Sequence, residues 1–216
     1  MTCAICHIRK PKRECPGVRG EICTICCGRE REESVDCPFD CHWLRDAHQH
    51  EKPPEFDRAL IPNLDVKITE EFLEQNQVLL AFIAVSVFEA WLETPAATDW
   101  DVREALQALI STWRTLQSGI YYESRPDNTF AASIAAHVKK KIDEVREREV
   151  QERGSSSIRD SVILNVLMFL QRLEYLHNNG RKRSRAFLDF LRGFYAPSME
   201  EKEESIVEPK EPLIIL

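Results

Sequence analysis

The sequence predicts a mainly α-helical protein, in which a small two-zinc, cysteine-rich module precedes an all-α bundle of about five helices. Three observations support this prediction. All eight cysteines lie within the first 41 of 216 residues. Beyond residue 68, apolar residues recur at three- and four-residue steps, which is the period of an amphipathic helix. The same region shows none of the apolar–polar alternation that a half-buried strand produces.

Composition and the first residues predict a cytoplasmic protein. An apolar fraction of 43% is enough for a packed core, and a net charge of −7 disfavours general nucleic-acid binding. Met1-Thr2-Cys3 leads directly into cysteines and charges rather than a secretory signal. The longest uncharged stretch, Gln75 to Phe88, is shorter than the roughly 18 residues that a membrane span requires. We therefore expect no membrane association.

Changes in composition divide the chain into four parts. Residues 1–50 form the cysteine-rich module, 51–67 a polar linker with Pro53 and Pro54, 68–196 the helical domain, and 197–216 an acidic tail with an apolar end. The module has too few large apolar residues to fold without a staple. In a reducing compartment that staple is expected to be metal rather than disulfides.

Cysteine spacing predicts two metal sites. Cys3-Ala-Ile-Cys6 and Cys23-Thr-Ile-Cys26 are two C-x2-C units separated by sixteen residues, a spacing typical of structural zinc sites. Four cysteines remain for a second tetrahedron, namely Cys15, Cys27, Cys37 and Cys41. The adjacent Cys26 and Cys27 would then serve different ions. Gly28 is expected to allow the tight backbone turn that follows them.

Several assignments within the module stay open. Cys15 can exchange sites with Cys23 or Cys26, and His7, His42 or His48 can replace a thiolate. Zinc is favoured over an iron–sulfur cluster because the C-x2-C-x2-C-x3-C-P run is missing from the sequence. Two complete four-thiolate sets leave no coordination position for water or substrate. The sites are therefore expected to be structural rather than catalytic.

Nucleic-acid binding by the module is the second functional hypothesis. Residues 1–50 carry eight basic and eight acidic side chains, and two zinc tetrathiolates would bring the loaded module to about −4. Only the cluster Arg9-Lys10-Pro11-Lys12-Arg13 offers a basic contact surface, and no aromatic residues interleave with it. The charge balance therefore favours a solvated loop.

The motif order resembles a group of uncharacterised bacterial proteins with an N-terminal segment CP-x-x-x-G-x-x-C-x-x-CCG…CP-x-DC-x-x-L. The matching residues are Cys15-Pro16, Gly20, Cys23, Cys26-Cys27-Gly28, Cys37-Pro38, Asp40-Cys41 and Leu44. The resemblance implies a zinc-binding segment but no activity. The module is also loosely similar to two-zinc fingers of the MYND and HIT kinds, which bind protein partners. Those fingers end in His-x3-Cys, whereas this chain has His48 and no cysteine beyond Cys41.

Capping residues and apolar periodicity place five helices in the helical domain. They are expected at about 69–93, 98–120, 129–153 and 158–177, with a short fifth helix around residues 187–194. Thr69 and Thr98 are predicted N-caps, and Gly154 is predicted to end the third helix. The basic stretch Arg181–Arg185 is expected to be a solvated loop that an acidic partner or the tail could contact.

No motif in the helical domain predicts catalysis, because no phosphate loop, nucleophile elbow or H-E-x-x-H is present in the sequence. The candidate interaction patch is Tyr121, Tyr122, Glu123 and Arg125. Alternatively, the two rings pack on the next helix while Glu123 and Arg125 pair. An enzyme with a pocket in this domain is the third hypothesis, for which a deep polar pocket including Glu123, Arg125 or His137 would be the sign.

The leading functional prediction is a non-enzymatic zinc-binding protein that acts through another protein, as an adaptor or regulator. The closed thiolate sites and the missing catalytic motifs support it. The apolar end of the tail, Leu213-Ile214-Ile215-Leu216, is a further candidate contact, either in a groove of the bundle or on a partner.

Overall fold

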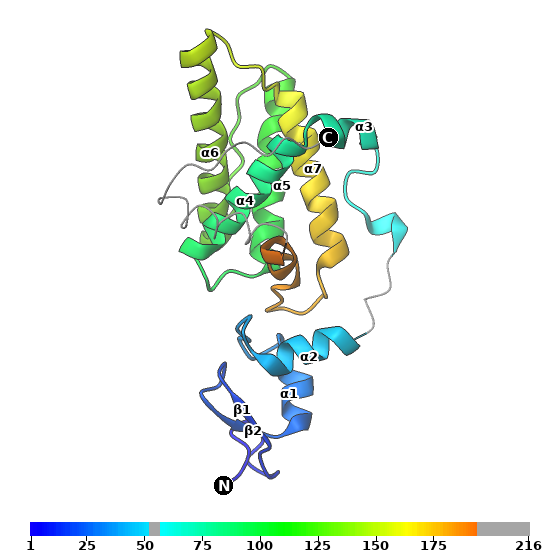
Figure 1. The fold of residues 1–216 in the computed structure, drawn as a ribbon, viewed down its shortest axis with the longest axis vertical. Helices are drawn as coiled ribbons and strands as arrows, with labels where there is room; N and C mark the ends of the chain where they lie inside the picture. The colour runs from blue at the N-terminus through cyan, green and yellow to red at the C-terminus, as the bar shows by residue number, and fades with distance from the viewer. Residues whose placement is uncertain (52–56, 194–216) are drawn as a thin grey trace, which may run out of the picture.

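A computed structural model describes residues 1–51 and 57–193 of the chain. The cysteine-rich module lies at one end of the molecule and the helical bundle at the other (Figure 1). The predicted mainly helical fold, with a cysteine-rich module followed by a bundle, is confirmed. The predicted prolines of the linker, the end of the fifth helix and the acidic tail at 197–216 lie outside the described residues.

Two short strands and two short helices build the module. Strands β1 (Arg13–Cys15) and β2 (Gly20–Ile22) pair antiparallel, with Cys15 opposite Gly20. Helices α1 (Thr24–Glu30) and α2 (His42–His50) follow. The hairpin places Cys15 at its turn and delivers Cys23 to the start of α1, so residues from both C-x2-C units meet.

The interior of the module consists mainly of cysteine. Its buried cluster has nine residues, of which only Ile22, Val35 and Leu44 are not cysteine. Three aliphatic side chains bury far too little apolar surface to offset the conformational entropy lost by about fifty residues. The module therefore needs an additional source of stability, as its composition predicts.

Five helices and a final helical segment make up the bundle. They are α3 (Glu70–Gln75), α4 (Gln77–Glu93), α5 (Asp99–Gln117), α6 (Thr129–Arg153), α7 (Asp160–His177) and residues 186–193. Helix α5 packs against both α6 and α7, and α4 packs against the same two helices (Figure 1). Trp113, Ile134, Leu167 and Phe187 meet in one buried core. Among the described residues, the length and hydropathy needed to cross a membrane do not occur together in any helix.

The predicted helix boundaries hold in most places and fail in two. Thr69 caps α3 by accepting a hydrogen bond from the Phe72 N–H, and Gly154, with φ of 79°, ends α6. The expected first helix is broken at Asn76, whose side-chain amide donates to the Phe72 carbonyl at 2.8 Å and competes with the backbone ladder. Helix α5 ends at Gln117 rather than near Ile120, because Gly119 is left-handed.

The described part of the linker lies along the bundle. It contains a short 3-10 turn, η1 (Arg58–Leu60), and then Asn63, whose amide donates to the Gln171 side chain of α7 at 2.7 Å. The Arg172 guanidinium donates to the carbonyls of Pro62, Asn63 and Val66. Residues 61–67 are thus held by α7 rather than forming a free connection.

Residues 179–185 join the module to the bundle, and we refer to them as the joint segment. The Arg183 N–H donates to the Glu32 carbonyl at 2.7 Å, and the Arg181 guanidinium bonds the Arg31 carbonyl and the Glu51 carboxylate. Arg185 is buried between the two parts. The prediction of a solvated basic loop is therefore wrong, because Arg181, Arg183 and Arg185 all make hydrogen bonds to the module.

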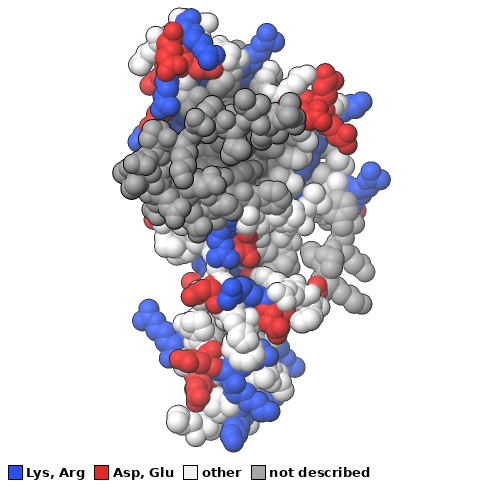
Figure 2. Space-filling model, in the orientation of Figure 1, with Lys and Arg blue, Asp and Glu red and all other residues white. Residues whose placement is uncertain are grey.

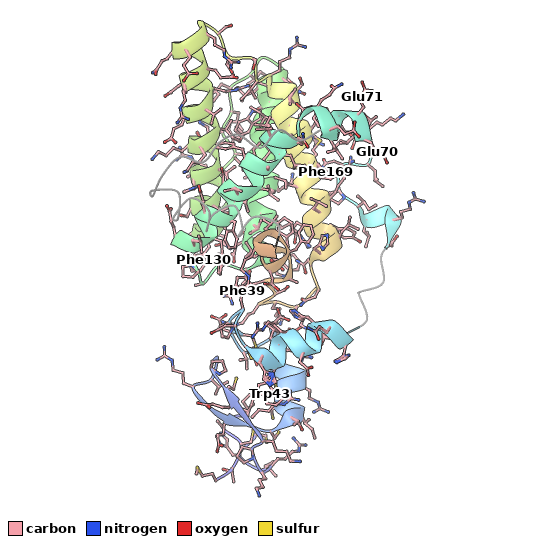
Figure 3. The ribbon with its side chains drawn as sticks, in the orientation of Figure 1. Phe39, Trp43, Glu70, Glu71, Phe130 and Phe169 are labelled. Atoms are coloured by element: carbon pink, nitrogen blue, oxygen red, sulfur yellow. The ribbon has the colours of Figure 1, made fainter. Side chains whose placement is uncertain are left out.

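An aromatic contact supports the same junction. The Phe39 ring, from the loop between Cys37 and Cys41, has its centroid 4.8 Å from that of Trp91 in α4. The Arg192 guanidinium lies over the Phe39 ring at 4.7 Å, and Figure 3 shows Phe39 where the module meets the bundle. Phe39 also packs against the main hydrophobic core of the bundle. The loop that carries two of the predicted metal ligands thus contacts the bundle directly.

Candidate metal centre

The structure brings Cys3, Cys6, Cys23 and Cys26 into one cluster, in which all four sulfur atoms lie within 4.8 Å of one another. A tetrahedral zinc site, with metal–sulfur bonds of about 2.3 Å, requires sulfurs about 3.8 Å apart. Cys3 and Cys6 come from the N-terminal loop, Cys23 caps α1, and Cys26 occupies its first turn. This four-cysteine group could hold a metal ion.

Backbone N–H groups point at the sulfurs of this cluster. The Cys23 N–H donates to Cys3 Sγ at 3.2 Å, and the Cys26 N–H donates to Cys23 Sγ at 3.4 Å. Burial by itself would raise the pKa of Cys3, but backbone hydrogen bonds from Cys6, Cys23 and Ile5 outweigh it and lower that pKa to about 6. The arrangement favours thiolate, which is the form that binds metal.

The four thiols cannot all ionise without a cation. Burial, followed by the neighbouring thiols, raises the pKa of Cys26 to about 12, although its partner Cys3 is shifted the other way. In addition to burial, each thiolate would repel the next one in a small volume with little water. A divalent cation would remove that repulsion, so the donor set fits a metal ion.

Two arginines of the predicted basic loop face sulfur atoms. A side-chain hydrogen bond with Cys23 raises the pKa of Arg9. The Arg13 guanidinium donates to Cys27 Sγ at 3.2 Å and lies over the Trp43 ring at 4.3 Å. On the face that Figure 2 shows, acidic side chains lie among the basic ones over the module. Part of the basic cluster therefore balances the charge of the cysteines instead of forming a contact surface for nucleic acid.

The second set, Cys15, Cys27, Cys37 and Cys41, surrounds a separate small cavity. Its volume is about 10 Å³, close to what one water molecule or ion occupies. Cys26 and Cys27 reach different centres because successive side chains of a helix point about 100° apart, and both residues lie in α1. Cys26 thus belongs to the four-cysteine cluster, whereas Cys27 lines the separate cavity.

The cysteines of the second set are less closely grouped than those of the first. Within residues 1–51 and 57–193, the first set is the only group of three or more His, Cys, Asp or Glu residues whose side chains lie close enough together to hold a metal ion. Burial raises the pKa of Cys37 to about 11, opposed by a backbone hydrogen bond from Glu32. All eight cysteines are free thiols. The structure therefore gives one closed four-cysteine cluster and one open cluster around a cavity.

The three candidate histidines lie outside the closed cluster. His42 stacks on Trp43, with ring centroids 4.0 Å apart, and His48 Nε2 lies 2.9 Å from Glu32 Oε2. That hydrogen bond raises the pKa of His48. His7 is exposed, with φ of 55°. His42 and His48 have other partners in the structure, and the first set consists of cysteines alone.

Two glycines of the module should respond oppositely to alanine. Gly28 lies inside α1 with open space around it, so the expected tight turn is wrong, and Gly28→Ala should be neutral or stabilise by up to about 1 kcal/mol. A Cβ at Gly17 would lie 2.8 Å from Val35 Cγ1 and against the Asp36 carbonyl. We expect Gly17→Ala to destabilise the module by about 1–3 kcal/mol. Hydrogen exchange over residues 1–51 measures both effects. Equal exchange in the two variants would contradict the expected difference between the crowded Gly17 and the open Gly28.

The candidate interaction patch follows α5. The side chains of Tyr121 and Tyr122 are each 65% exposed, so the alternative in which they pack on the next helix is wrong. The expected pair is present: Arg125 Nε donates to Glu123 Oε1 at 3.0 Å, and this hydrogen bond lowers the pKa of Glu123. The Tyr121 hydroxyl donates to the same carboxylate at 3.2 Å.

A cavity of about 320 Å³ lies between this segment and α6. Glu123, Arg125 and Lys139 are its charged lining residues, and Leu109, Ala132 and Ala135 are among the apolar ones. His137 lies elsewhere on α6, where its Nδ1 is 3.2 Å from Glu93 Oε2 of α4. Of the charged residues that line the cavity, Glu123 and Arg125 thus pair with each other and Lys139 pairs with Asp143.

Comparison with known protein families, with characterised proteins and with solved structures finds no match to this chain. The chemistry of the site therefore has to be argued from its own residues.

Proposed function

We propose that this protein is a non-enzymatic zinc-binding adaptor or regulator of the cytoplasm that acts by binding another protein. The closed cluster of Cys3, Cys6, Cys23 and Cys26 is the observation that supports this most strongly. A soft donor set of four thiolates, with all sulfurs within 4.8 Å of one another, favours zinc among the common cellular cations. Because all four positions are thiolates, the ion has no open position for substrate, and its role is structural.

The proposed partner surface is the patch of Tyr121, Tyr122, Glu123 and Arg125. Exposed tyrosines beside an apolar cavity, with a charged pair in its lining, have the composition of protein–protein hot spots. The neighbouring Ile120 is also exposed, which extends the apolar part of the surface. The resemblance of the module to two-zinc fingers that bind proteins supports the same role.

Metal analysis tests the first half of the proposal. Protein purified without added metal is expected to contain two zinc ions per chain, one for each cysteine set. Metal-free protein with its cysteines oxidised to disulfides would contradict both the zinc sites and the reducing compartment.

Replacing both patch tyrosines should abolish partner binding without unfolding the chain. Exposed substitutions usually change stability by no more than about 0.5 kcal/mol, so Tyr121→Ala combined with Tyr122→Ala is expected to keep the wild-type unfolding midpoint. A protein recovered with the wild type from its host, and then purified, should bind the variant at least about tenfold more weakly in a titration.

The matched control is Leu60→Ala combined with Trp100→Ala, which removes two exposed apolar side chains elsewhere on the chain. This control should bind the purified partner as the wild type does. If the tyrosine variant binds normally, or if only the control variant loses binding, the patch is not the interaction surface.

A further inference from the structure

The second cysteine set, unlike the first, lies against the helical bundle. The Arg185 side chain is 7% exposed and reaches across the junction to both parts of the protein. On the bundle side, its guanidinium donates to the Ala97 and Ala96 carbonyls at 2.9 and 3.3 Å. On the module side, it pairs with the Asp36 carboxylate and donates to the Cys37 carbonyl at 3.5 Å. One buried cation thus holds the backbone of a candidate ligand.

The joint segment also holds Glu32, a buried residue whose backbone is close enough to Cys37 to affect its thiol. Glu32 is left-handed, with φ of 55°, which is strained for a residue with a Cβ. Its carbonyl accepts from the Arg183 N–H at 2.7 Å, and its buried carboxylate accepts from the Asn179 amide at 2.9 Å. Contacts with the bundle therefore stabilise the conformation that places this residue beside Cys37.

The first set is built within the module alone. The hydrogen bonds to its sulfurs come from Cys23 and Cys26, and the loop that carries Cys3 is held by the Arg9 and Glu21 carbonyls. The second set has three members on the hairpin, α1 and the start of α2, whereas Cys37 lies on the segment that the bundle holds. The two sets therefore differ in what determines their geometry.

We propose that the bundle is part of the second metal site, with Arg185 as the positioning residue that sets Cys37 against Cys15, Cys27 and Cys41. Zinc bound there and the docking of the module on the bundle would then stabilise each other, because coupling between two equilibria is reciprocal. The inference rests on the proposed zinc binding. It adds that the second ion fastens the two parts of the protein together.

The test uses the full-length chain and compares Arg185→Ala and Arg185→Lys with the wild type. Cobalt(II) titration, followed by its thiolate absorption and by competition with a chelator, resolves two binding events and their affinities. Loss of an outer residue that orients a ligand usually costs about 10- to 100-fold in metal affinity. We expect Arg185→Ala to weaken one of the two events by that factor and leave the other unchanged, with Arg185→Lys in between.

The matched control is Arg172→Ala. Arg172 also holds backbone carbonyls inside the bundle, but those of residues 62, 63 and 66, away from the cysteines. The Arg172→Ala variant should bind metal at both sites with wild-type affinity. Hydrogen exchange tests the effect of the metal on the junction. When metal fills the site that Arg185→Ala weakens, residues 179–185 should exchange more slowly in the wild type but not in Arg185→Ala.

The outcomes separate this inference from the proposed function. A wild type that binds one metal per chain contradicts the two-site zinc protein itself. Two wild-type sites with unchanged affinities in Arg185→Ala overturn only the role of the bundle. If Arg185→Ala loses helical structure, Arg185→Lys replaces it, because lysine keeps the buried positive charge but cannot bridge Ala97, Asp36 and Cys37 with one nitrogen. Unchanged metal affinities in Arg185→Lys would then overturn the inference.

Discussion

Replacing Cys23 by serine is expected to unfold the N-terminal module while the helical bundle stays folded. Cys23 is a candidate metal ligand, accepts the capping hydrogen bond from the Cys26 N–H, and donates its own N–H to Cys3 Sγ. Structural zinc contributes about 10–16 kcal/mol of apparent binding free energy in small zinc domains. Three buried aliphatic residues cannot replace that contribution.

Hydrogen exchange measured by peptide segment separates the two parts of the chain. In Cys23→Ser, residues 1–51 should lose protection, whereas α5 and α7 should keep theirs. Ile25→Ser is the matched control, because Ile25 lies between the same two cysteines, is exposed and is not a ligand. Wild-type protection of residues 1–51 in Cys23→Ser would show that metal at the first set does not stabilise the module.

The second large effect is expected at Asp99, a buried carboxylate in the first turn of α5. It accepts hydrogen bonds from the Ser184 hydroxyl at 2.7 Å and from the Phe187 and Leu188 N–H groups at 3.2 and 3.3 Å. Asp99 thus caps the final helical segment, 186–193, from a distant part of the chain. Asp99→Ala would leave three buried donors without this acceptor and should destabilise the bundle by about 2 kcal/mol.

Chemical denaturation followed by helical circular dichroism measures this loss. Glu104→Ala, an exposed substitution in the same helix, serves as the control and should change the unfolding free energy by no more than about 0.5 kcal/mol. An Asp99→Ala variant as stable as Glu104→Ala would contradict the capping role.

The same residue should give the bundle a measurable pH dependence. Burial raises the pKa of Asp99 to about 6, above its usual value of about 3.9. The folded protein then holds a proton that the unfolded chain releases between pH 4 and 6. Protonated Asp99 therefore favours folding fully below about pH 4, and that contribution is lost as the pH rises through 6.

Asp99→Asn isolates this effect because asparagine does not titrate. As the pH rises from 4 to 7, the unfolding free energy of the wild type should fall relative to the variant by up to about 3 kcal/mol. Both proteins carry the same cysteines, so metal loss at low pH cancels in the difference. A difference that is constant with pH would show that burial does not shift this carboxyl group.

Local sequence signals predicted most helices of the bundle but none of the strands and helices of the module. Thr69 and Gly154 are where capping rules expect them, and the apolar face of residues 102–113 is buried. Boundaries failed at Asn76 and Ile120, where one side-chain hydrogen bond or one glycine decides the end of a helix. These local effects on the end of a helix involve small energies, and the spacing of apolar residues does not reveal them.

The candidate sites were also predictable only in part. The C-x2-C spacing predicted a first set that the structure brings together, because both halves of each pair lie within one turn of the chain. The exposure of Tyr121 and Tyr122 was not predictable, since it depends on where α5 ends and how the next segment crosses α6. The role of Asp99 was not predictable either, because its hydrogen-bond partners lie more than 80 residues further along the chain.

By itself, the sequence determined that a cysteine-rich module precedes a helical bundle, because cysteine spacing and helical periodicity are properties of neighbouring residues. Only the tertiary structure decided that the basic segment 179–185 is the junction between them, and that Arg185 holds Cys37. Those contacts join residues nearly 150 positions apart. Their partners are set by how the bundle packs, and no local pattern in the chain encodes that packing.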